Sequence, residues 1–190
     1  MRRLMILGIV PLMLTAACGH ATASEPKAAP AGGNGSPAAT ASRESQIYSA
    51  VLRRFLTTPG ENAHLQFSKV YVVDHAEADA ADPMKTTKSE QTTPIGPADQ
   101  LTITAALRDV ATIHFIPARD DVIEDRDDCP SVRDDGIAIL LGRPTPADTG
   151  YHVGINGFAA CTGAIWRTYV VADKAGSLTV TDTVGPIAIS

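Results

Sequence analysis

Histidine has the widest chemical range of the side chains in this sequence, because its imidazole can act as an acid, a base or a metal ligand near neutral pH. No two of the histidines have the spacing of a metal-binding motif, and neither an HExxH motif nor a Cys/His cluster occurs. We therefore predict neither a metal site nor a cofactor. The five histidines are His20, His64, His75, His114 and His152.

Two of these histidines fall in segments that we expect to be strands. Alternation along a strand places His114 and His152 opposite apolar neighbours, so both are expected on the less apolar face of a sheet. If their strands are neighbours, the two imidazoles would line a polar pocket with Arg167 or Asp182. The alternative is that both histidines face solvent.

Carboxylates gather in one segment, where residues 120–135 contain eight of them. Clustered carboxylates can bind Ca²⁺, which prefers six to eight oxygen ligands. An EF-hand loop beginning at Asp125 does not fit, because Pro130 stands at the sixth position, where glycine is required, and Gly136 at the twelfth, where glutamate is required. We expect a solvated acidic loop here.

The N-terminal segment has the pattern of an export signal. Arg2 and Arg3 precede an apolar run of 11 residues, Leu4 to Leu14, which is too short to span a bilayer but fits a signal peptide. The residues that follow, Leu14-Thr15-Ala16-Ala17-Cys18, resemble the lipobox at which bacterial lipoproteins are cut before a lipidated cysteine. The match departs from the family pattern at Thr15, where an aliphatic residue is preferred.

The resemblance implies cleavage after residue 17 and acylation of Cys18, including palmitate, in an exported protein of the cell envelope. Gly19 takes the place of the aspartate that acts as a retention signal. The lipid is therefore expected on the outer face of the plasma membrane or in an outer membrane. An ordinary secretory signal cut near Ala21 to Ala23 is the alternative.

Cysteine content agrees with export. If lipid consumes Cys18, the remaining two cysteines, Cys129 and Cys161, form an even pair in an oxidising compartment, and a disulfide between them is expected. That bond would exclude Cys161 as a nucleophile activated by His152. GxSxG, P-loop and GxGxxG motifs are also absent from the sequence, so no catalytic residue is predicted.

The elements that must position these residues follow a low-complexity tether. We expect a signal peptide at 1–17, a flexible tether rich in Ala, Gly, Pro and Ser at 18–43, and one domain at 44–190. Apolar spacing predicts a helix from Ser42 or Ser45 to Leu56 and a second helix from Ala98 to Asp109. The predicted strands are 66–74, 112–117, 136–142, 150–156, 164–172 and 177–183.

This order predicts an α+β fold with an antiparallel sheet of about five to six strands. The sheet would end in a C-terminal meander, and both helices would cover one face. The mature chain would carry 14 basic against 21 acidic residues, a net charge of −7, which disfavours nucleic acid as a partner.

We expect a lipid-anchored envelope protein that acts as a binding or structural module for an unknown protein or small ligand. The alternatives are an envelope hydrolase with a His/acid site and a small-ligand carrier with a pocket between helices and sheet.

Overall fold

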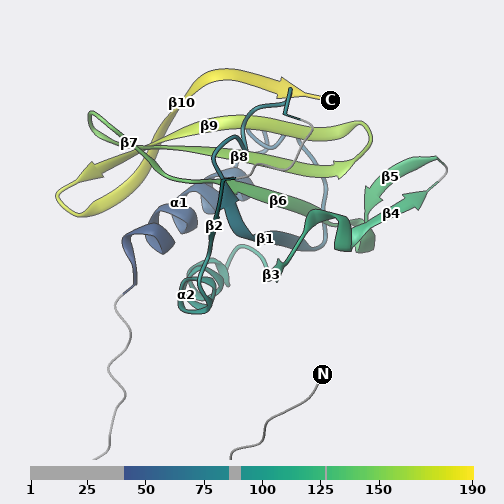
Figure 1. The fold of residues 1–190 in the computed structure, drawn as a ribbon, viewed down its shortest axis with the longest axis horizontal. Coiled ribbons are helices and arrows are strands. Elements are labelled where there is room, and N and C mark those ends of the chain that lie inside the picture. The colour runs from purple at the N-terminus through teal and green to yellow at the C-terminus, as the bar shows by residue number, and fades with distance from the viewer. Residues whose placement is uncertain (1–40, 86–90, 127) are drawn as a thin grey trace, which may run out of the picture. The chain divides into compact units, whose positions relative to one another are not determined.

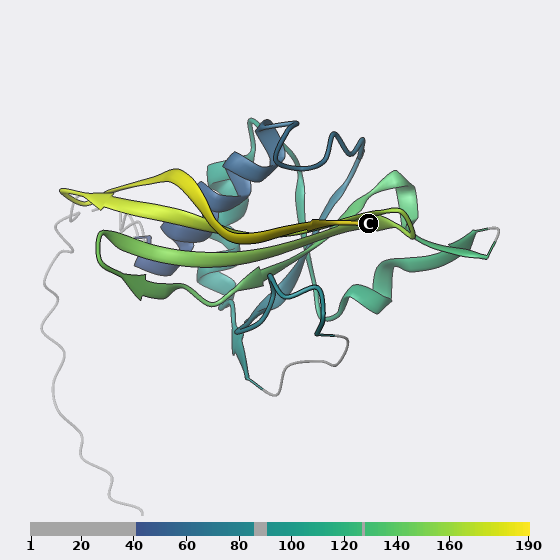
Figure 2. The ribbon, with the colours of Figure 1, turned by 90° about the horizontal axis from the view of Figure 1, so that it is seen from above.

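The computed structural model describes residues 41–85, 91–126 and 128–190. It is an α+β fold in which two helices pack on one face of a mixed, mostly antiparallel sheet of ten strands (Figures 1 and 2). Among these residues no helix is long and apolar enough to cross a membrane. The sheet has more strands than predicted.

The two helices lie close to where the apolar spacing placed them. Helix α1 spans Arg43–Thr57, and the Ser42 hydroxyl caps it by accepting a hydrogen bond from the Ser45 backbone N–H at 3.0 Å. Helix α2 spans Pro97–Leu107 and has proline in its first turn. The buried side of α1 faces the sheet, which leaves its charged residues in solvent.

The strands fall into a main path and shorter pieces beside it. In sheet order the main path is β10, β9, β8, β6, β1 and β2, while β3 pairs with β1, β7 with β8, β4 with β5, and β5 with β8. Their bounds are β1 Val70–Glu77, β2 Thr92–Pro94, β3 Ile113–Ile116, β4 Ile123–Arg126, β5 Cys129–Val132, β6 Ile137–Gly142, β7 Thr145–Ala147, β8 Gly150–Ala160, β9 Gly163–Lys174 and β10 Ser177–Ile189.

The C-terminal meander is confirmed, since β6, β8, β9 and β10 pair antiparallel in sequence order. The purely antiparallel sheet was wrong, because β1 pairs parallel with both β3 and β6. The chain leaves β1, passes through β2 and α2, and returns as β3, and such a helical crossover makes the two strands parallel. The run Ile137 to Leu141 is a central strand, as its apolar character on both faces predicted.

The acidic segment 120–135 is more ordered than the loop that we expected. It contains the short 3-10 helix η1 (Arg119–Val122), the β4–β5 hairpin and the 3-10 helix η2 (Arg133–Asp135). Val122 and Val132 are buried and anchor the hairpin, so two apolar residues outweigh the surrounding charge in deciding the local structure.

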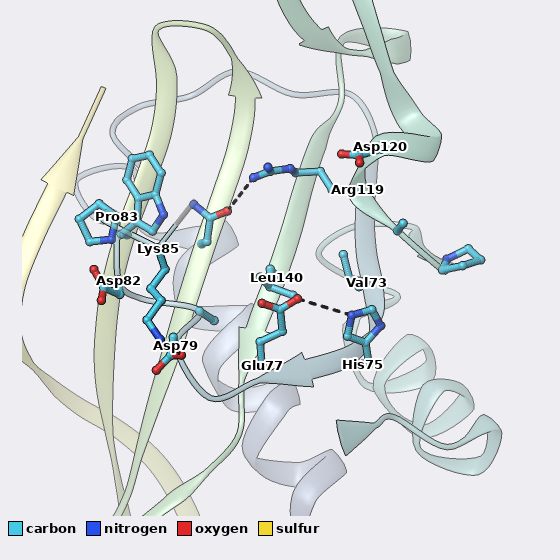
Figure 3. Close-up of a pocket in the computed structure, with 15 residues that line it drawn as sticks. Val73, His75, Glu77, Asp79, Asp82, Pro83, Lys85, Arg119, Asp120 and Leu140 are labelled. Carbon is cyan, nitrogen blue, oxygen red and sulfur yellow. Dashed lines mark hydrogen bonds and ion pairs between the residues drawn. The ribbon is translucent and has the colours of Figure 1, made fainter. Parts of the chain in front are cut away.

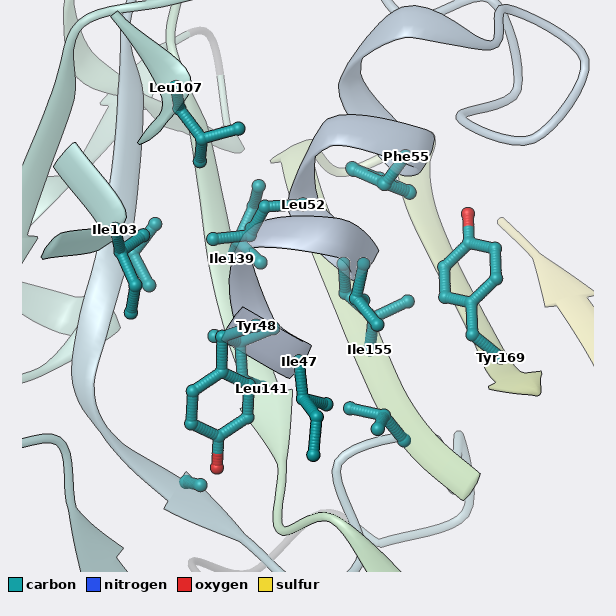
Figure 4. Close-up of a cluster of buried hydrophobic side chains, with 14 of the residues drawn as sticks. Ile47, Tyr48, Leu52, Phe55, Ile103, Leu107, Ile139, Leu141, Ile155 and Tyr169 are labelled. Carbon is teal, nitrogen blue, oxygen red and sulfur yellow. The ribbon is translucent and has the colours of Figure 1, made fainter. Parts of the chain in front are cut away.

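The two faces of the sheet differ in what covers them. On the helix face, side chains from α1 and α2 interleave with those of β6, β8 and β9 to form the larger core (Figure 4). We call the opposite side the open face; there a smaller core is formed by Tyr71, Val73, Ile116, Val122, Val132 and Ala138. Among the described residues, the one helical element that contributes to this smaller core is η1, which has four residues.

Candidate functional site

The predicted cysteine pair is confirmed. Cys129 and Cys161 lie at disulfide distance, with 2.10 Å between the sulfurs and 5.5 Å between the Cα atoms. The bond joins the start of β5 to the turn between β8 and β9, so it ties the acidic hairpin to the end of the meander. Cys18 lies outside the residues that the structure describes.

The structure does not bring His114, His152 and Arg167 into one pocket. His114 lies on β3, where its ring centroid is 5.7 Å from that of Tyr71. His152 lies on β8, and strands β1 and β6 separate β8 from β3. Arg167 pairs with Ile155 in the β8–β9 register, which turns its side chain to the helix face. The expected pocket is therefore wrong, because β3 and β8 are not neighbours and Arg167 lies on the helix face of the sheet.

Arg167 belongs instead to a group of polar residues at the C-terminal end of α1. Only 4 % of Arg167 is exposed, and its Nη1 lies 4.0 Å from Glu61 Oε2. Glu61 also accepts a hydrogen bond from Arg54 Nε at 2.8 Å. We call this group the closed cluster; its members are Arg54, Glu61, Asn62, Arg167 and Tyr169.

Four buried polar atoms of the closed cluster have no hydrogen-bond partner among the described residues: Glu61 Oε2, Asn62 Oδ1, Arg167 Nε and Tyr169 OH. Burial raises the pKa of Tyr169, and the charge of Glu61 raises it further. Burial also opposes ionisation of Glu61, but the hydrogen bond from Arg54 and the charge of Arg167 outweigh it and hold the pKa of Glu61 below its ordinary value.

A concave site with a volume of about 440 Å³ lies on the open face. Its floor consists of residues from four adjacent strands, namely His75 on β1, Leu140 on β6, Asn156 on β8 and Trp166 on β9. One wall is the segment 77–85 after β1, and the other is the segment 117–120 that enters η1 (Figure 3). We call this site the open-face pocket.

His75 is the histidine among the residues that line the open-face pocket. Its Nδ1 lies 3.1 Å from Asp74 Oδ1 and its Nε2 lies 3.6 Å from Glu77 Oε1. Each ring nitrogen therefore faces a carboxylate, and this arrangement fixes the orientation of the ring. The pair Lys85–Asp79, with 2.6 Å between Nζ and Oδ2, lies on the same wall as Glu77.

Arg119 enters the open-face pocket from the other wall. Its Nη1 donates to Asn156 Oδ1 at 3.4 Å, and its guanidinium lies over the Phe158 ring at 5.3 Å. Asn156 is 3 % exposed, and its Nδ2 donates to the Ile165 carbonyl at 3.4 Å. The buried amide thus connects Arg119 to the sheet and limits where the guanidinium can point.

No sequence motif pointed to the residues of this pocket. His75 was named only among the five histidines, and Trp166 was not proposed as a site residue. The one available signal was Asn156, a polar residue at the end of a predicted strand. Within the described ranges, no group of three or more His, Cys, Asp or Glu is placed to hold a metal ion.

The arrangement suits a ligand that is apolar in its middle and charged at its ends. Leu140, Trp166 and Pro83 offer apolar surface, and charged side chains stand on both walls. No protein-family model matches the sequence, and neither the curated proteins nor the solved structures contain a significant match. The chemistry of the open-face pocket is therefore the basis of the functional proposal.

Proposed function

We propose that this chain is a lipid-anchored cell-envelope protein whose domain binds a small organic ligand in the open-face pocket. The observation that carries the binding activity is a concavity of about 440 Å³ with both apolar and polar residues on its floor and charged residues on its walls. This volume lies within the usual range for small-molecule sites, and mixed lining of this kind is typical of them.

The anchor rests on the lipobox-like sequence before Cys18 and on the tether behind it. More than one acyl chain on a cysteine makes membrane attachment stable, because each buried methylene contributes about 0.8 kcal/mol. The acidic balance of the chain supports attachment through lipid rather than through the domain surface, and it disfavours nucleic acid.

The anchor is tested by expressing the full chain in bacteria fed an alkyne analogue of palmitate. The chain should carry the label and sediment with membranes, and Cys18→Ala should lose both properties while Ser36→Ala keeps them. A chain released in soluble form without label would support the secretory alternative.

Binding is tested with the purified full chain and a library of small organic molecules. Trp166 is the only tryptophan in the chain, so its fluorescence reports on the open-face pocket directly. Ala118→Phe adds a ring to the pocket wall and should abolish the fluorescence response. Ala98→Phe places the same ring on the exposed N-terminal turn of α2 and should leave the response intact. Responses that survive Ala118→Phe would contradict the proposal.

A second function, hydrolysis, is favoured by one observation: His75 lies between Asp74 and Glu77 in the open-face pocket. An imidazole held by carboxylates can act as a general base toward water. Product formation from ester, amide or peptide substrates, lost in His75→Gln, would support this function. Ligand recovered unchanged after long incubation would support binding alone.

A further inference from the structure

The two walls of the open-face pocket both contain charged side chains, and charges of either sign stand on each. The wall formed by 77–85 contributes Glu77, Asp79 and Asp82 together with Lys85 (Figure 3). The other wall contributes Arg119 and Asp120, and Asp120 has an interaction of its own. A ligand with both an anionic and a cationic group could therefore contact Arg119 on one wall and a carboxylate on the other.

Arg119 is suited to hold an anion. In the part of the chain described, no carboxylate forms an ion pair with it, and its hydrogen bond to Asn156 uses only Nη1. The guanidinium has five N–H donors, so others remain for a carboxylate, which it can bind through two parallel hydrogen bonds. Asn156 and Phe158 hold the group in place before any ligand arrives.

Glu77 is suited to hold a cation at the other side. Lys85 neutralises Asp79 on the same wall, whereas among the described residues the ion-pair partner of the Glu77 side chain is His75, at 3.6 Å, which is charged only when protonated. The Glu77 side chain is 15 % exposed. In such a partly desolvated position an ammonium group would interact with the carboxylate more strongly than at an exposed site.

The strand register gives the scale of the separation between these two groups, because Arg119 contacts Asn156. Glu77 pairs with Gly142 on β6, and Asn156 pairs with Leu140 on the same strand. Adjacent strands lie about 4.8 Å apart and each residue rises about 3.3 Å, which places the backbones of Glu77 and Asn156 about 12 Å apart across the floor. A ligand that contacts both Glu77 and Arg119 therefore has its charges at about this separation or closer.

An extended peptide spans about 3.3 to 3.6 Å per residue, so two or three residues with free ends have charges at a matching separation. Between Glu77 on β1 and Asn156 on β8 the floor is apolar at Leu140 on β6, and Trp166 adds apolar surface beyond Asn156 on β9. This surface suits the side chain of a middle residue. We propose that the open-face pocket binds a peptide of two or three residues, with its carboxylate at Arg119 and its ammonium at Glu77.

This inference rests on the proposed binding function, and the experiment separates the two. The probes are the tripeptide Ala-Leu-Ala and its N-acetylated, C-amidated and doubly blocked forms, added to the purified full chain. Binding is measured by calorimetry and by Trp166 fluorescence. Hydrogen bonds to charged groups contribute about 1.5 to 3 kcal/mol, so each blocked end should weaken binding about tenfold or more.

Two substitutions assign each end of the peptide to its wall. Arg119→Gln should bind the free and the C-amidated peptides within about twofold of one another, and Glu77→Gln should do the same for the free and the N-acetylated peptides. Arg108→Gln and Glu124→Gln change exposed residues of the same types outside the pocket, and both should bind like the unsubstituted chain. Circular dichroism checks that each variant is folded, and Arg119→Met, which also removes the charge, replaces Arg119→Gln if the latter is not.

The outcomes distinguish the two proposals. If all four peptides bind equally, or if none binds while another small molecule changes Trp166 fluorescence, the peptide inference is wrong and the binding function stands. If no molecule in the peptide set or in the library binds, both proposals are wrong.

Discussion

The closed cluster and the open-face pocket lie on opposite sides of the same strand and contain similar side chains. Trp166 and Arg167 are neighbours on β9, yet Trp166 lines the open-face pocket while Arg167 lies buried in the closed cluster. Each region pairs an arginine with partners on other elements. The two regions differ in what covers them. Helix α1 and the loop after it cover the closed cluster, whereas in the part of the chain described no helix of that length lines the pocket.

That difference changes what the polar groups do. In the closed cluster, a buried donor or acceptor left without a partner costs about 1 to 3 kcal/mol, so the cluster restricts how the helix face can pack. In the open-face pocket, polar groups border a cavity, and a ligand can supply the missing partners. Under the proposed function, the closed cluster therefore contributes to stability and the open-face pocket to binding.

The largest expected effect comes from substituting the two neighbours on β9. Arg167→Met removes the buried guanidinium beside Glu61, and breaking a buried ion pair from one side costs about 3 to 5 kcal/mol. Trp166→Phe keeps an aromatic ring on the half-buried pocket floor and should cost less than about 1.5 kcal/mol. Urea unfolding followed by circular dichroism measures both changes.

A double substitution provides the control for this pair. Glu61→Leu added to Arg167→Met replaces the buried charges with apolar groups, and such replacements are often neutral or stabilising. It should recover part of the lost stability. Equal losses for Trp166→Phe and Arg167→Met would mean that the two faces do not differ as described.

Two glycines on β8 sharpen the comparison with a smaller effect. A Cβ at Gly157 would lie 2.6 Å from Phe55 Cζ and 3.2 Å from Ile137 Cδ1, inside the larger core. Gly157→Ala should therefore cost about 1 to 3 kcal/mol through overpacking. A Cβ at Gly154 would lie 3.1 Å from the Ala81 backbone N and Cβ. Ala81 belongs to a segment that forms neither helix nor strand.

Gly154→Ala should cost less than about 1 kcal/mol but should displace the pocket wall at Ala81. The expected pattern is a lower urea midpoint for Gly157→Ala with normal ligand affinity, and a nearly normal midpoint for Gly154→Ala with altered affinity. If instead Gly154→Ala lowered the urea midpoint and Gly157→Ala altered ligand affinity, the two faces would not differ in the way described.

The sequence predicted the helix face far better than the open face. Ser42 and the apolar spacing after it located α1, and the apolar run of Ile137 to Leu141 identified the central strand. These features are local, because a cap or a periodic pattern is complete within one segment. The short strands β2, β4, β5 and β7 were missed because three or four residues contain no usable period.

The open-face pocket depends on relations between segments that no single segment encodes. The register pairs Asn156 with Trp166, and Ile155 with Arg167. It therefore decides which residues of β8 and β9 lie together on the same face of the sheet. A one-residue change of register exchanges the two faces. The error that put Arg167 in the expected pocket was of this kind, and the wall at 77–85 is equally a result of tertiary packing.

The smallest expected effect is the dependence of stability on acid. The folded-state pKa of Glu61 is lowered, because the hydrogen bond from Arg54 and the charge of Arg167 outweigh its burial. A lowered carboxyl pKa contributes stability above the unfolded value, and this contribution is lost as the pH falls through the folded value. Glu61→Gln should therefore lower the stability near neutral pH, but by less than Arg167→Met does, because the glutamine carbonyl can still accept the hydrogen bond from Arg54 and the nearest Arg167 nitrogen is 4.0 Å away.

The titration of Glu61 must be separated from that of a second acid, Asp109, because the hydrogen bond from Arg53 lowers the pKa of Asp109 to about 2. That acid also makes the unsubstituted chain less stable at low pH, and Glu61→Gln leaves it in place. The useful quantity is therefore the difference in unfolding free energy between the two chains, followed from neutral to acidic pH. It should shrink toward zero in acid, because both chains are then uncharged at position 61. A difference that stays constant with pH would show that Glu61 contributes through packing rather than through charge, and that the closed cluster is not held together electrostatically.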